Sequence, residues 1–127
     1  LEKPQFAVSY NRSLGHANWV AWHLEASDLG TADRQDDFRP DPALPAGWEA
    51  ARRSDYDNSG FDRGHLCPSA DRTATPADNS ATFLMTNIVP QSPNLNRNTW
   101  ENLESYCRDL AKAGNELYVY AGTYGTG

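Results

Sequence analysis

Apolar and polar residues alternate in two stretches near the start of the chain, residues 6–11 (FAVSYN) and 17–27 (ANWVAWHLEAS). Alternation with a period of two is typical of strands that bury one face. Between the two stretches stand Asn11, Ser13 and Gly15, which are residue types that favour a turn. The pattern therefore predicts a strand pair joined by that turn.

A long segment without periodicity follows. Residues 30–60 are rich in Gly, Pro, Asp and Arg, which indicates an irregular connection of the kind that often carries function. Residues 61–68 (FDRGHLCP) predict a short strand that ends in a turn, because Pro68 has no N–H to donate to a sheet. Residues 76–81 can open a helical turn, and residues 83–89 (FLMTNIV) are apolar enough for a buried segment.

The clearest helix is predicted for residues 98 to about 113. Asn96 or Asn98 can cap its start, and Gly114 can close its end. Helical spacing places five residues on one side, which we expect to face the core. They are Trp100, Leu103, Cys107, Leu110 and Ala111.

The apolar run at residues 117–121 predicts a central strand that is buried on both faces. Such a strand needs a neighbour on each edge and cover on each face. The upstream segments supply cover for one face only. We therefore expect residues 1–127 to be the N-terminal part of a longer folded unit, completed by more chain or by a second polypeptide after Gly127.

Composition and charge add limits to this picture. A chain of 127 residues suffices for one domain with a modest core. The net charge of −6, from 11 Lys and Arg against 17 Asp and Glu, argues against a broad nucleic-acid-binding surface. It leaves room for a local cluster of arginines, which suit bidentate phosphate contacts. No apolar run approaches the roughly 18 residues that a membrane span requires, so we expect no membrane partner.

One histidine stands in an unusual context. His65 follows Asp62, Arg63 and Gly64 in the sequence DRGH, and the glycine permits a tight backbone path beside it. With an ordinary pKa of about 6.5, this histidine could accept a proton at neutral pH. The alternative is a structural histidine that is hydrogen-bonded inside the fold. The other two histidines lack such surroundings, and we interpret His16 and His23 as surface or packing residues.

Two blocks, DRGHLCPSADRT and TNIVPQSPNLNRNTWENLE, closely resemble the DNA/RNA non-specific endonucleases of the ββα-metal (His-Me finger) superfamily, to which endonuclease G belongs. The motif DRGH, combined with the spacing N-x₃-Q-x₄-N-x₃-W-x₃-E, is far more specific than DRGH alone. The match runs from about Val20 to the C-terminus. The resemblance implies an α+β fold, with a mostly antiparallel sheet and a ββα-metal motif, in which residues 1–127 form a single nuclease domain or the N-terminal part of a longer one.

The resemblance also implies roles for individual residues. His65 matches the general base that activates water, and Asn96 matches the ligand of a single divalent metal. Glu104 matches the glutamate that holds water in the metal's shell and serves catalysis. Asn87 matches an asparagine that supports the catalytic site. The expected cofactor is Mg²⁺, with Mn²⁺ or another divalent cation as alternatives, since a hard cation prefers oxygen ligands and keeps several waters.

Arginines complete the set of expected site residues. Arg108 matches a phosphate-contacting arginine on the same helix, and Arg34 matches an arginine that reaches the site from the long loop, with Arg39 as a rival. Arg63 is a further candidate for contact with substrate phosphate. Arginines can stabilise a transition state whose charge lies almost wholly on phosphate oxygens.

Each assignment has a simpler alternative. Asn96 could serve only as a helix cap, and Glu104 and Arg108 could form a surface ion pair worth a few tenths of a kcal/mol. Cys67 could be considered as a nucleophile, but no pattern that would stabilise an oxyanion accompanies it, and that role leaves Asn96 and Glu104 without a function. The order and spacing of the whole set favour the catalytic interpretation.

The two cysteines, Cys67 and Cys107, are too few for a zinc site of their own. They can form one disulfide in an oxidising compartment or remain two buried thiols. In an extended segment Cys67 shares a face with His65, and on the helix Cys107 projects about 60° from Glu104. We therefore expect the two cysteines to lie close enough to pair if the protein is exported.

The predicted function is metal-dependent cleavage of DNA and RNA with little sequence preference, with recognition through backbone phosphates. By resemblance, the product carries a 5′-phosphate. Two alternatives stay open: a catalytically silent nucleic-acid-binding module, and one partner of a toxin-immunity pair. A protein inhibitor and a secreted or periplasmic location are further expectations, although no signal peptide is visible in this chain.

Overall fold

The structure is a computed structural model, and it describes residues 1–123. An antiparallel hairpin begins the fold, with β1 (Ala7–Asn11) paired to β2 (His16–Leu24). Gly15 adopts a φ of +74° at the end of the connecting turn, and its N–H donates to the carbonyl of Asn11 over 2.9 Å. The left-handed conformation favours glycine because that residue has no Cβ. The predicted strand pair and its turn are confirmed.

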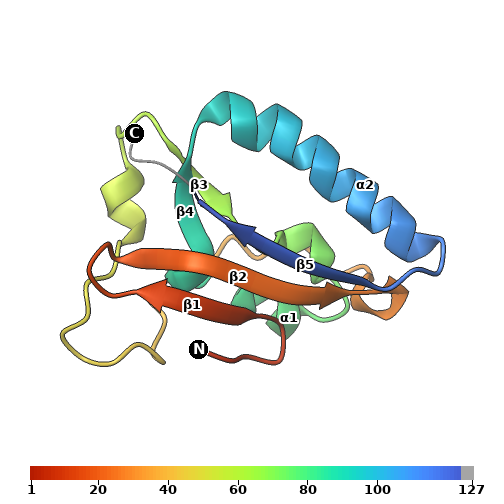
Figure 1. The fold of residues 1–127 in the computed structure, drawn as a ribbon, viewed down its shortest axis with the longest axis horizontal. Coiled ribbons are helices and arrows are strands. Elements are labelled where there is room, and N and C mark those ends of the chain that lie inside the picture. The colour runs from red at the N-terminus through yellow and green to blue at the C-terminus, as the bar shows by residue number, and fades with distance from the viewer. Residues whose placement is uncertain (124–127) are drawn as a thin grey trace.

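The strand β5 (Leu117–Gly122) pairs with the other edge of β2, so the first sheet has the order β1-β2-β5 (Figure 1). Within residues 1–123, β5 is an edge strand, and Tyr118 and Tyr120 are 74% and 73% exposed. Leu117, Val119 and Ala121 turn inward, while the two tyrosines face solvent, so the described residues cover one face of this strand, as expected. Burial of its other face and pairing of its other edge stay predictions, because they concern the longer folded unit.

A second antiparallel sheet consists of β3 (Asp62–His65) and β4 (Ile88–Gln91). Gly64 is required here, because a Cβ at this position would collide with the side chain of Gln91 on the paired strand. The strand prediction for this segment is confirmed. Its end at His65, three residues before Pro68, agrees with the expected loss of pairing at the proline.

Short helical elements join the strands. The helix α1 (Pro76–Ala81) lies at the predicted position, and the hydroxyl of its N-cap residue Thr75 accepts a hydrogen bond from the N–H of Asp78 over 3.1 Å. The segment 83–89 is buried throughout, as predicted. Single 3₁₀ turns complete the connections: η1 (Ala26–Asp28), η2 (Arg53–Tyr56), η3 (Ser69–Asp71) and η4 (Met85–Asn87).

The long helix α2 (Trp100–Lys112) is preceded by a π-helical turn, η5 (Leu95–Thr99). The expected cap at Asn96 or Asn98 is wrong, because both residues lie inside this turn and neither caps with its side chain. The hydroxyl of Ser92 instead accepts from the N–H of Leu95 over 3.3 Å. Gly114 closes the helix with a φ of +101°, as predicted.

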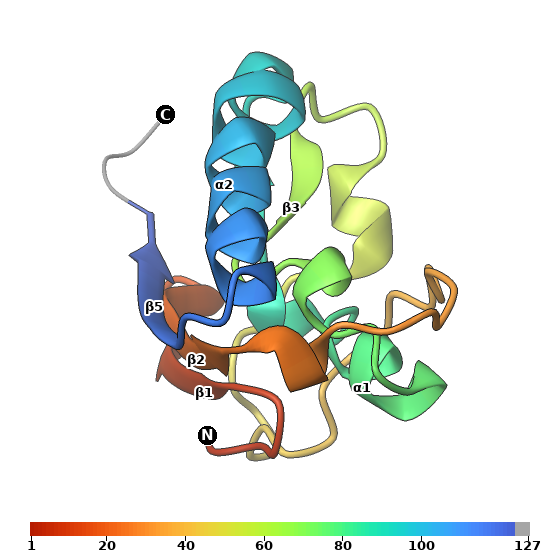
Figure 2. The ribbon, with the colours of Figure 1, turned by 90° about the vertical axis from the view of Figure 1, so that its right-hand side faces the viewer.

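Helix α2 packs beside β5 and spans the gap between the first sheet and β3 (Figures 1 and 2). Ala111 is fully buried, and Trp100 and Cys107 pack against the same core. Leu103, which we expected in the core, is 49% exposed. The buried face is rotated toward Glu104 and Arg108, so polar residues of α2 point to the interior of the molecule.

The main core lies between the first sheet, α2 and the β3–β4 pair. Within residues 1–123 both cysteines are free thiols, so the bridge expected for an exported protein is not formed in this structure. Cys67 is fully buried, and Cys107 packs against the same core cluster. Both are thus accommodated as apolar side chains. No helix in residues 1–123 has the length and apolar character needed to cross a bilayer.

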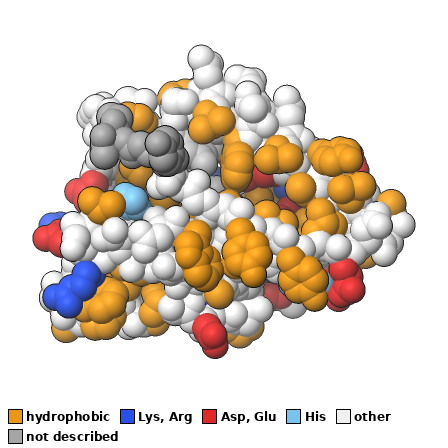
Figure 3. Space-filling view, viewed as in Figure 1, with side chains coloured by type: hydrophobic (Ala, Val, Ile, Leu, Met, Phe, Trp, Pro, Cys, Tyr) orange, Lys and Arg blue, Asp and Glu red, His pale blue; other side chains and the backbone are white. Residues whose placement is uncertain are grey.

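The face that carries β2 and β5 shows a row of hydrophobic side chains (Figure 3). Trp19, Tyr118 and Tyr120 contribute to the exposed aromatic surface. The rings of Trp19 and Tyr120 pack edge to face, with their centroids 6.0 Å apart. This face lies on the side of the sheet opposite to the residues that turn into the core.

Candidate active site

A cleft of about 270 Å³ lies where β3, the loop after it and α2 meet. Its walls come from four separate parts of the sequence: the long loop, β3, the turn η3, and the η5–α2 helical segment. The lining residues are Arg34, Arg63, His65, Pro68, Ser69, Ala70, Asn96, Arg97, Glu101, Glu104 and Arg108. Five residues expected in the site from sequence, besides His65, therefore line one cavity: Arg34, Arg63, Asn96, Glu104 and Arg108.

His65 ends β3 and is 8% exposed. Its ring contacts Phe83 edge-on at 4.7 Å and lies 5.7 Å from the ring of Phe38. The Nε2 atom is buried and has no hydrogen-bond partner within residues 1–123. An unpaired buried polar atom is rare in folded proteins, and it marks this nitrogen as available for a proton or a ligand.

The environment of His65 keeps its imidazole neutral. The pKa of His65 is lowered from 6.5 to about 3, mainly by burial and in addition by the positive charge of Arg34, while Asp36 opposes the shift. The expectation of an ordinary histidine pKa is therefore wrong for this state of the protein. A neutral imidazole is the form that a general base requires, because its lone pair is free to accept a proton.

Asn87 secures the backbone beside His65. Its amide donates to the carbonyls of Cys67 and Thr82, each over 2.9 Å, and its side-chain oxygen accepts from the N–H of Cys67 over 2.9 Å. Asn87 is fully buried and does not line the cleft. Asn87 therefore fixes the backbone conformation of the residues that follow His65. It does not reach the cleft, so it would not contact a substrate bound there.

Asn96 is oriented from β3. Its amide nitrogen donates to Asp62 over 2.9 Å, and Arg97 binds the same carboxylate through two hydrogen bonds of 3.0 and 2.8 Å. The bond from Asn96 is the largest of the interactions that hold the pKa of Asp62 below its usual value. Because the amide nitrogen donates to Asp62, the carbonyl oxygen of Asn96, which accepts no hydrogen bond from residues 1–123, is the atom that could bind a metal.

Arg108 is held by a buried carboxylate from the turn η3. Its Nη1 donates to Asp71 over 3.0 Å, and the indole N–H of Trp22 donates to the other oxygen of Asp71 over 2.9 Å. Asp71 is 2% exposed. The surface ion pair considered between Glu104 and Arg108 is not formed within residues 1–123, because Asp71 takes the place of Glu104 as the partner of Arg108.

Glu104 lies on the inner side of α2 in a setting that disfavours its charge. The pKa of Glu104 is raised from 4.5 to about 8, mainly by burial and in addition by the nearby negative charge of Asp71, while Arg108 opposes the shift. A cation that enters the cleft would stabilise the charged form of this carboxyl group and lower its pKa.

The loop arginines differ in position. Arg34 lines the cleft, donates to the hydroxyl of Ser69 over 3.4 Å and lies 5.0 Å above the ring of Phe83. Arg39 does not line the cleft and bonds to Asp37 and to the carbonyl of Ser80. Geometry thus favours Arg34 over its rival as the arginine that reaches the site.

Residues 1–127 match the family of DNA/RNA non-specific endonucleases over their whole length. The chain belongs to this family. It is 62% identical over 124 residues to a nuclease of Nostoc sp. (strain PCC 7120 / SAG 25.82 / UTEX 2576), covering 98% of this chain and 45% of that protein. It is 37% identical over 122 residues to mitochondrial endonuclease G of Homo sapiens, covering 94% of this chain and 41% of that protein.

Among solved structures, the crystal structure of an EndoG/EndoGI complex matches with a TM-score of 0.87 and 29% sequence identity. The match covers 96% of this chain and 51% of that chain. The chain thus spans about half or less of the length of these relatives. The α+β fold of the non-specific endonuclease family, with β3, β4 and α2 as its ββα unit, is confirmed.

Four residues in or beside the cleft were not expected from the sequence: Asp62, Asp71, Arg97 and Glu101. Arg97 and Glu101 line the cleft, whereas Asp62 and Asp71 hold residues that do. Asp62 and Asp71 stand in the block DRGHLCPSADRT that carries the resemblance to the family, so their position in the sequence was a signal. Their partners lie 34 and 37 positions away, which no local pattern reveals.

The donor set of the cleft fits a hard divalent cation. The free carbonyl oxygen of Asn96 and the carboxylates of Glu101 and Glu104 are oxygen donors, which Mg²⁺ prefers. The raised pKa of Glu104 indicates a carboxylate whose charge lacks full compensation from residues 1–123. Asn96, with Glu104 acting through water, would hold such an ion.

Proposed function

We propose that this chain carries the catalytic centre of an endonuclease that hydrolyses phosphodiester bonds of DNA and RNA without sequence preference. The observation that carries the proposal is the buried, neutral His65, with an unpaired Nε2, in the wall of a cleft that also contains Asn96 and Glu104. A module that only binds nucleic acid has no need of a base in this position. The family of the chain supports the same chemistry.

His65 accepts the proton of the attacking water at its neutral imidazole. Two aromatic rings, from Phe38 and Phe83, fix the imidazole plane, and Asn87 fixes the backbone that follows it. These contacts hold the base without occupying its Nε2 atom. The low pKa of His65 in the protein without substrate makes this residue a weak base. We infer that the negative charge of a bound phosphate raises the pKa of His65 when substrate binds.

Arginines bind the phosphate. Four arginines line the cleft, against two glutamates, and each arginine is also paired with an aspartate outside the lining. Guanidinium groups gathered around one cleft suit phosphate recognition, which carries no sequence information. Arg34, Arg63 and Arg108 are the proposed phosphate contacts. The bond to Asp71 uses Nη1 of Arg108, so other N–H groups of this guanidinium can still donate to a phosphate.

A divalent cation, Mg²⁺ or alternatively Mn²⁺, would be held by Asn96, with Glu104 acting through water, and it would supply Lewis-acid stabilisation of the phosphoryl oxygens and the leaving group. Asp62 keeps the amide of Asn96 in the orientation that exposes its carbonyl oxygen. The 5′-phosphate product is part of this proposal.

A plasmid-nicking assay with and without EDTA tests the function directly. We expect conversion of supercoiled plasmid and degradation of RNA in the presence of Mg²⁺, and no cleavage with EDTA. Binding of plasmid without nicking under all conditions would favour a silent binding module instead. Cleavage that persists in EDTA would contradict the proposed metal requirement.

We also propose two properties of the natural setting. The solved structure of an EndoG/EndoGI complex is one of EndoG inhibition, and this supports a protein inhibitor for the present chain, including an immunity-type partner. A secreted or periplasmic location stays a prediction from the sequence. Assaying nuclease activity in the medium, periplasm and cytoplasm of the source cells, with and without added cytoplasmic extract, tests both.

A further inference from the structure

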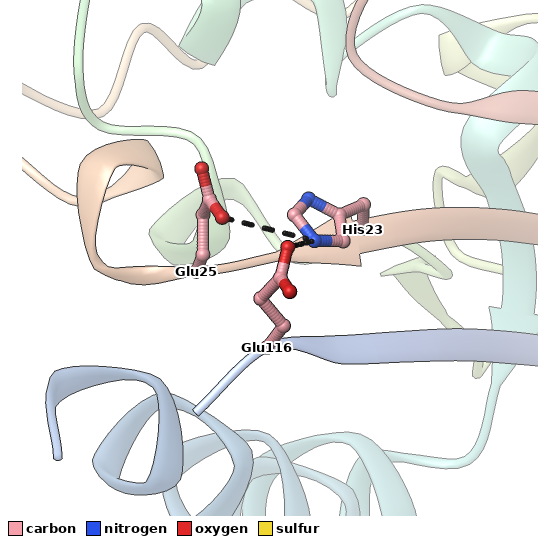
Figure 4. A group of neighbouring side chains, drawn as sticks. All are labelled: His23, Glu25 and Glu116. Atoms are coloured by element: carbon pink, nitrogen blue, oxygen red, sulfur yellow. Dashed lines mark hydrogen bonds and ion pairs between the residues drawn. The ribbon is translucent and has the colours of Figure 1, made fainter. Parts of the chain in front are cut away.

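A cluster of three potential metal ligands lies where the first sheet ends, apart from the catalytic cleft. His23 Nε2 lies 2.8 Å from Glu116 Oε1 and 3.8 Å from Glu25 Oε2 (Figure 4). One ligand atom from each residue lies within 4.8 Å of the other two. None of the three residues lines the catalytic cleft.

The register of the sheet places these side chains together. Leu24 of β2 pairs with Leu117 of β5, so Glu25 and Glu116 occupy the next opposed positions. Side chains alternate along a strand, and Leu24 is fully buried on the inner face. His23, Glu25 and Glu116 therefore share the outer face as a consequence of the backbone pairing, and not of one chosen rotamer.

We propose that His23, Glu25 and Glu116 bind a divalent transition-metal ion of the zinc class. Imidazole nitrogen with two carboxylate oxygens is a ligand set that Zn²⁺ uses when it keeps an open position for water. Nitrogen ligation separates this site from the oxygen-rich cleft, since Mg²⁺ favours oxygen donors alone. Ligands about 2.0–2.2 Å from a tetrahedral ion lie roughly 3.3–3.6 Å apart, and the two measured spacings, 2.8 and 3.8 Å, bracket this range.

Charge supports a cation at this position. Like charges at directly opposed positions of an antiparallel pair destabilise the sheet. Glu25 and Glu116 form such a pair at the open end of β2 and β5, and His23 alone offers them at most one positive charge. A divalent ion neutralises both carboxylates at once.

The surroundings already orient the ligands. The hydroxyl of Ser27 donates to Glu25 Oε1 over 2.8 Å, which leaves Oε2 turned toward His23. The imidazole of His23 lies 4.9 Å from the ring of Tyr118. The backbone of His23 is held as well, because Arg72 donates to its carbonyl over 2.7 Å. Partners of this kind typically fix ligand geometry around protein-bound metals.

The bound ion would connect the end of β2 to the start of β5, which is an edge strand within residues 1–123. Its expected role is therefore to stabilise the sheet edge and the turn that follows α2, with no part in hydrolysis. The competing arrangement is a protonated His23 paired with the two glutamates and no metal.

Isothermal titration of the full-length protein with Zn²⁺, in saturating Mg²⁺, tests the site. A His65→Ala background removes the catalytic histidine as an alternative ligand. We expect one Zn²⁺ per chain, with affinity reduced at least tenfold by His23→Ala and by the conservative Glu116→Gln. His16→Ala is the matched control, because His16 is on the same strand, outside the ligand cluster, and its Nδ1 lies 2.9 Å from the carbonyl of Ala17.

Thermal melting and Co²⁺ absorption give independent readouts. Zn²⁺ should raise the melting temperature of the His65→Ala protein but not that of its His23→Ala derivative, and Co²⁺ should give visible bands that the His23→Ala change removes. Absence of Zn²⁺ binding, or equal affinity in the His23→Ala and His16→Ala proteins, would overturn the proposal. Nuclease activity of the protein with native His65 reports separately on the proposed function.

Discussion

The side-chain amide of Asn96 donates to the carboxylate of Asp62 over 2.9 Å, across 34 positions of sequence. This bond joins the first residue of the DRGH motif to the π-helical turn before α2. It fixes which end of the Asn96 amide points away from Asp62. The strand that carries His65 and the turn that carries the proposed metal ligand are thereby held together by this bond and by the two bonds from Arg97 to the same carboxylate.

The Asn96 carbonyl leads to a prediction about metal affinity. Asn96→Ala should reduce activity mainly by raising the Mg²⁺ concentration at half-maximal rate, and additional Mg²⁺ should restore part of the rate because the other ligands are waters. The measurement is a Mg²⁺ titration of plasmid cleavage. Asn98→Ala, in the same turn but outside the cleft lining, serves as the control. An unchanged half-saturation for Asn96→Ala would exclude Asn96 as a ligand.

Removal of the proposed base should abolish the reaction. His65→Ala should lower the rate by 10²-fold or more, in line with the about 10²–10⁴-fold contribution of general base catalysis, while the fold stays intact. Gel-based cleavage rates and circular dichroism provide the measurements, and His16→Ala should cleave at the wild-type rate. Cleavage by His65→Ala at a near-wild-type rate would show that another group activates the water.

The raised pKa of Glu104 predicts a specific pH dependence of stability without metal. The folded protein holds a proton on Glu104 up to about pH 8, whereas the unfolded chain releases it near 4.5. The resulting contribution to the free energy of unfolding is complete below pH 4.5 and is lost as the pH rises toward 8. Between pH 6.5 and 8.5, His65 is neutral in the folded state, whereas in the unfolded chain, with a pKa of 6.5, it still releases about half a proton. This release partly opposes the effect of Glu104 near pH 6.5 and is the same in the Glu104→Gln protein.

Denaturation in EDTA across pH 6.5–8.5 checks this effect of Glu104. The wild-type protein should lose stability as the pH rises, and Glu104→Gln should show a flatter profile. Because metal binding favours the carboxylate, the affinity for Mg²⁺ should rise over the same interval in the wild type. Parallel profiles for the two proteins would contradict the raised pKa.

The Asp71–Arg108 pair predicts a positioning role for a residue outside the cleft. Asp71→Asn should lower kcat/KM for long DNA and reduce the slope of log kcat/KM against log salt by about one, because Arg108 loses its anchor. It should also lower the free energy of unfolding by about 1–3 kcal/mol. Trp22→Phe, which removes the other bond to Asp71, is the matched control. It should reduce stability but keep the salt dependence, and equal slopes in all three proteins would limit Asp71 to a structural role.

The exposed outer face of the first sheet predicts that residues 1–127 work as part of a longer catalytic domain. Tyr118 and Tyr120 are almost three-quarters exposed on an edge strand of the described structure. Exposed apolar edges favour association. Purified residues 1–127 should therefore aggregate or unfold without cooperativity by size exclusion and thermal melting, whereas the full-length protein should not. A monodisperse, active fragment would contradict this prediction.

The sequence by itself determined the local elements and the identity of most chemical groups. Period-two alternation located the β1–β2 hairpin, and turn residues located its reversal at Gly15. The resemblance to the endonuclease family singled out His65, Asn96 and Glu104, and the structure brings these three residues to one cleft. The hairpin could be located because alternation and turn conformation depend on a few neighbouring residues.

Only the tertiary structure decided the surroundings of these groups. Burial, which depends on packing between distant segments, lowers the pKa of His65 and raises that of Glu104. The pairing of β5 with β2 decides that the side chains of His23 and Tyr118 lie on the same side of the sheet. It also brings His23 next to Glu116, which is 93 positions away in the sequence. Desolvation and long-range register are properties of the assembled chain, so no local pattern of residues contains them.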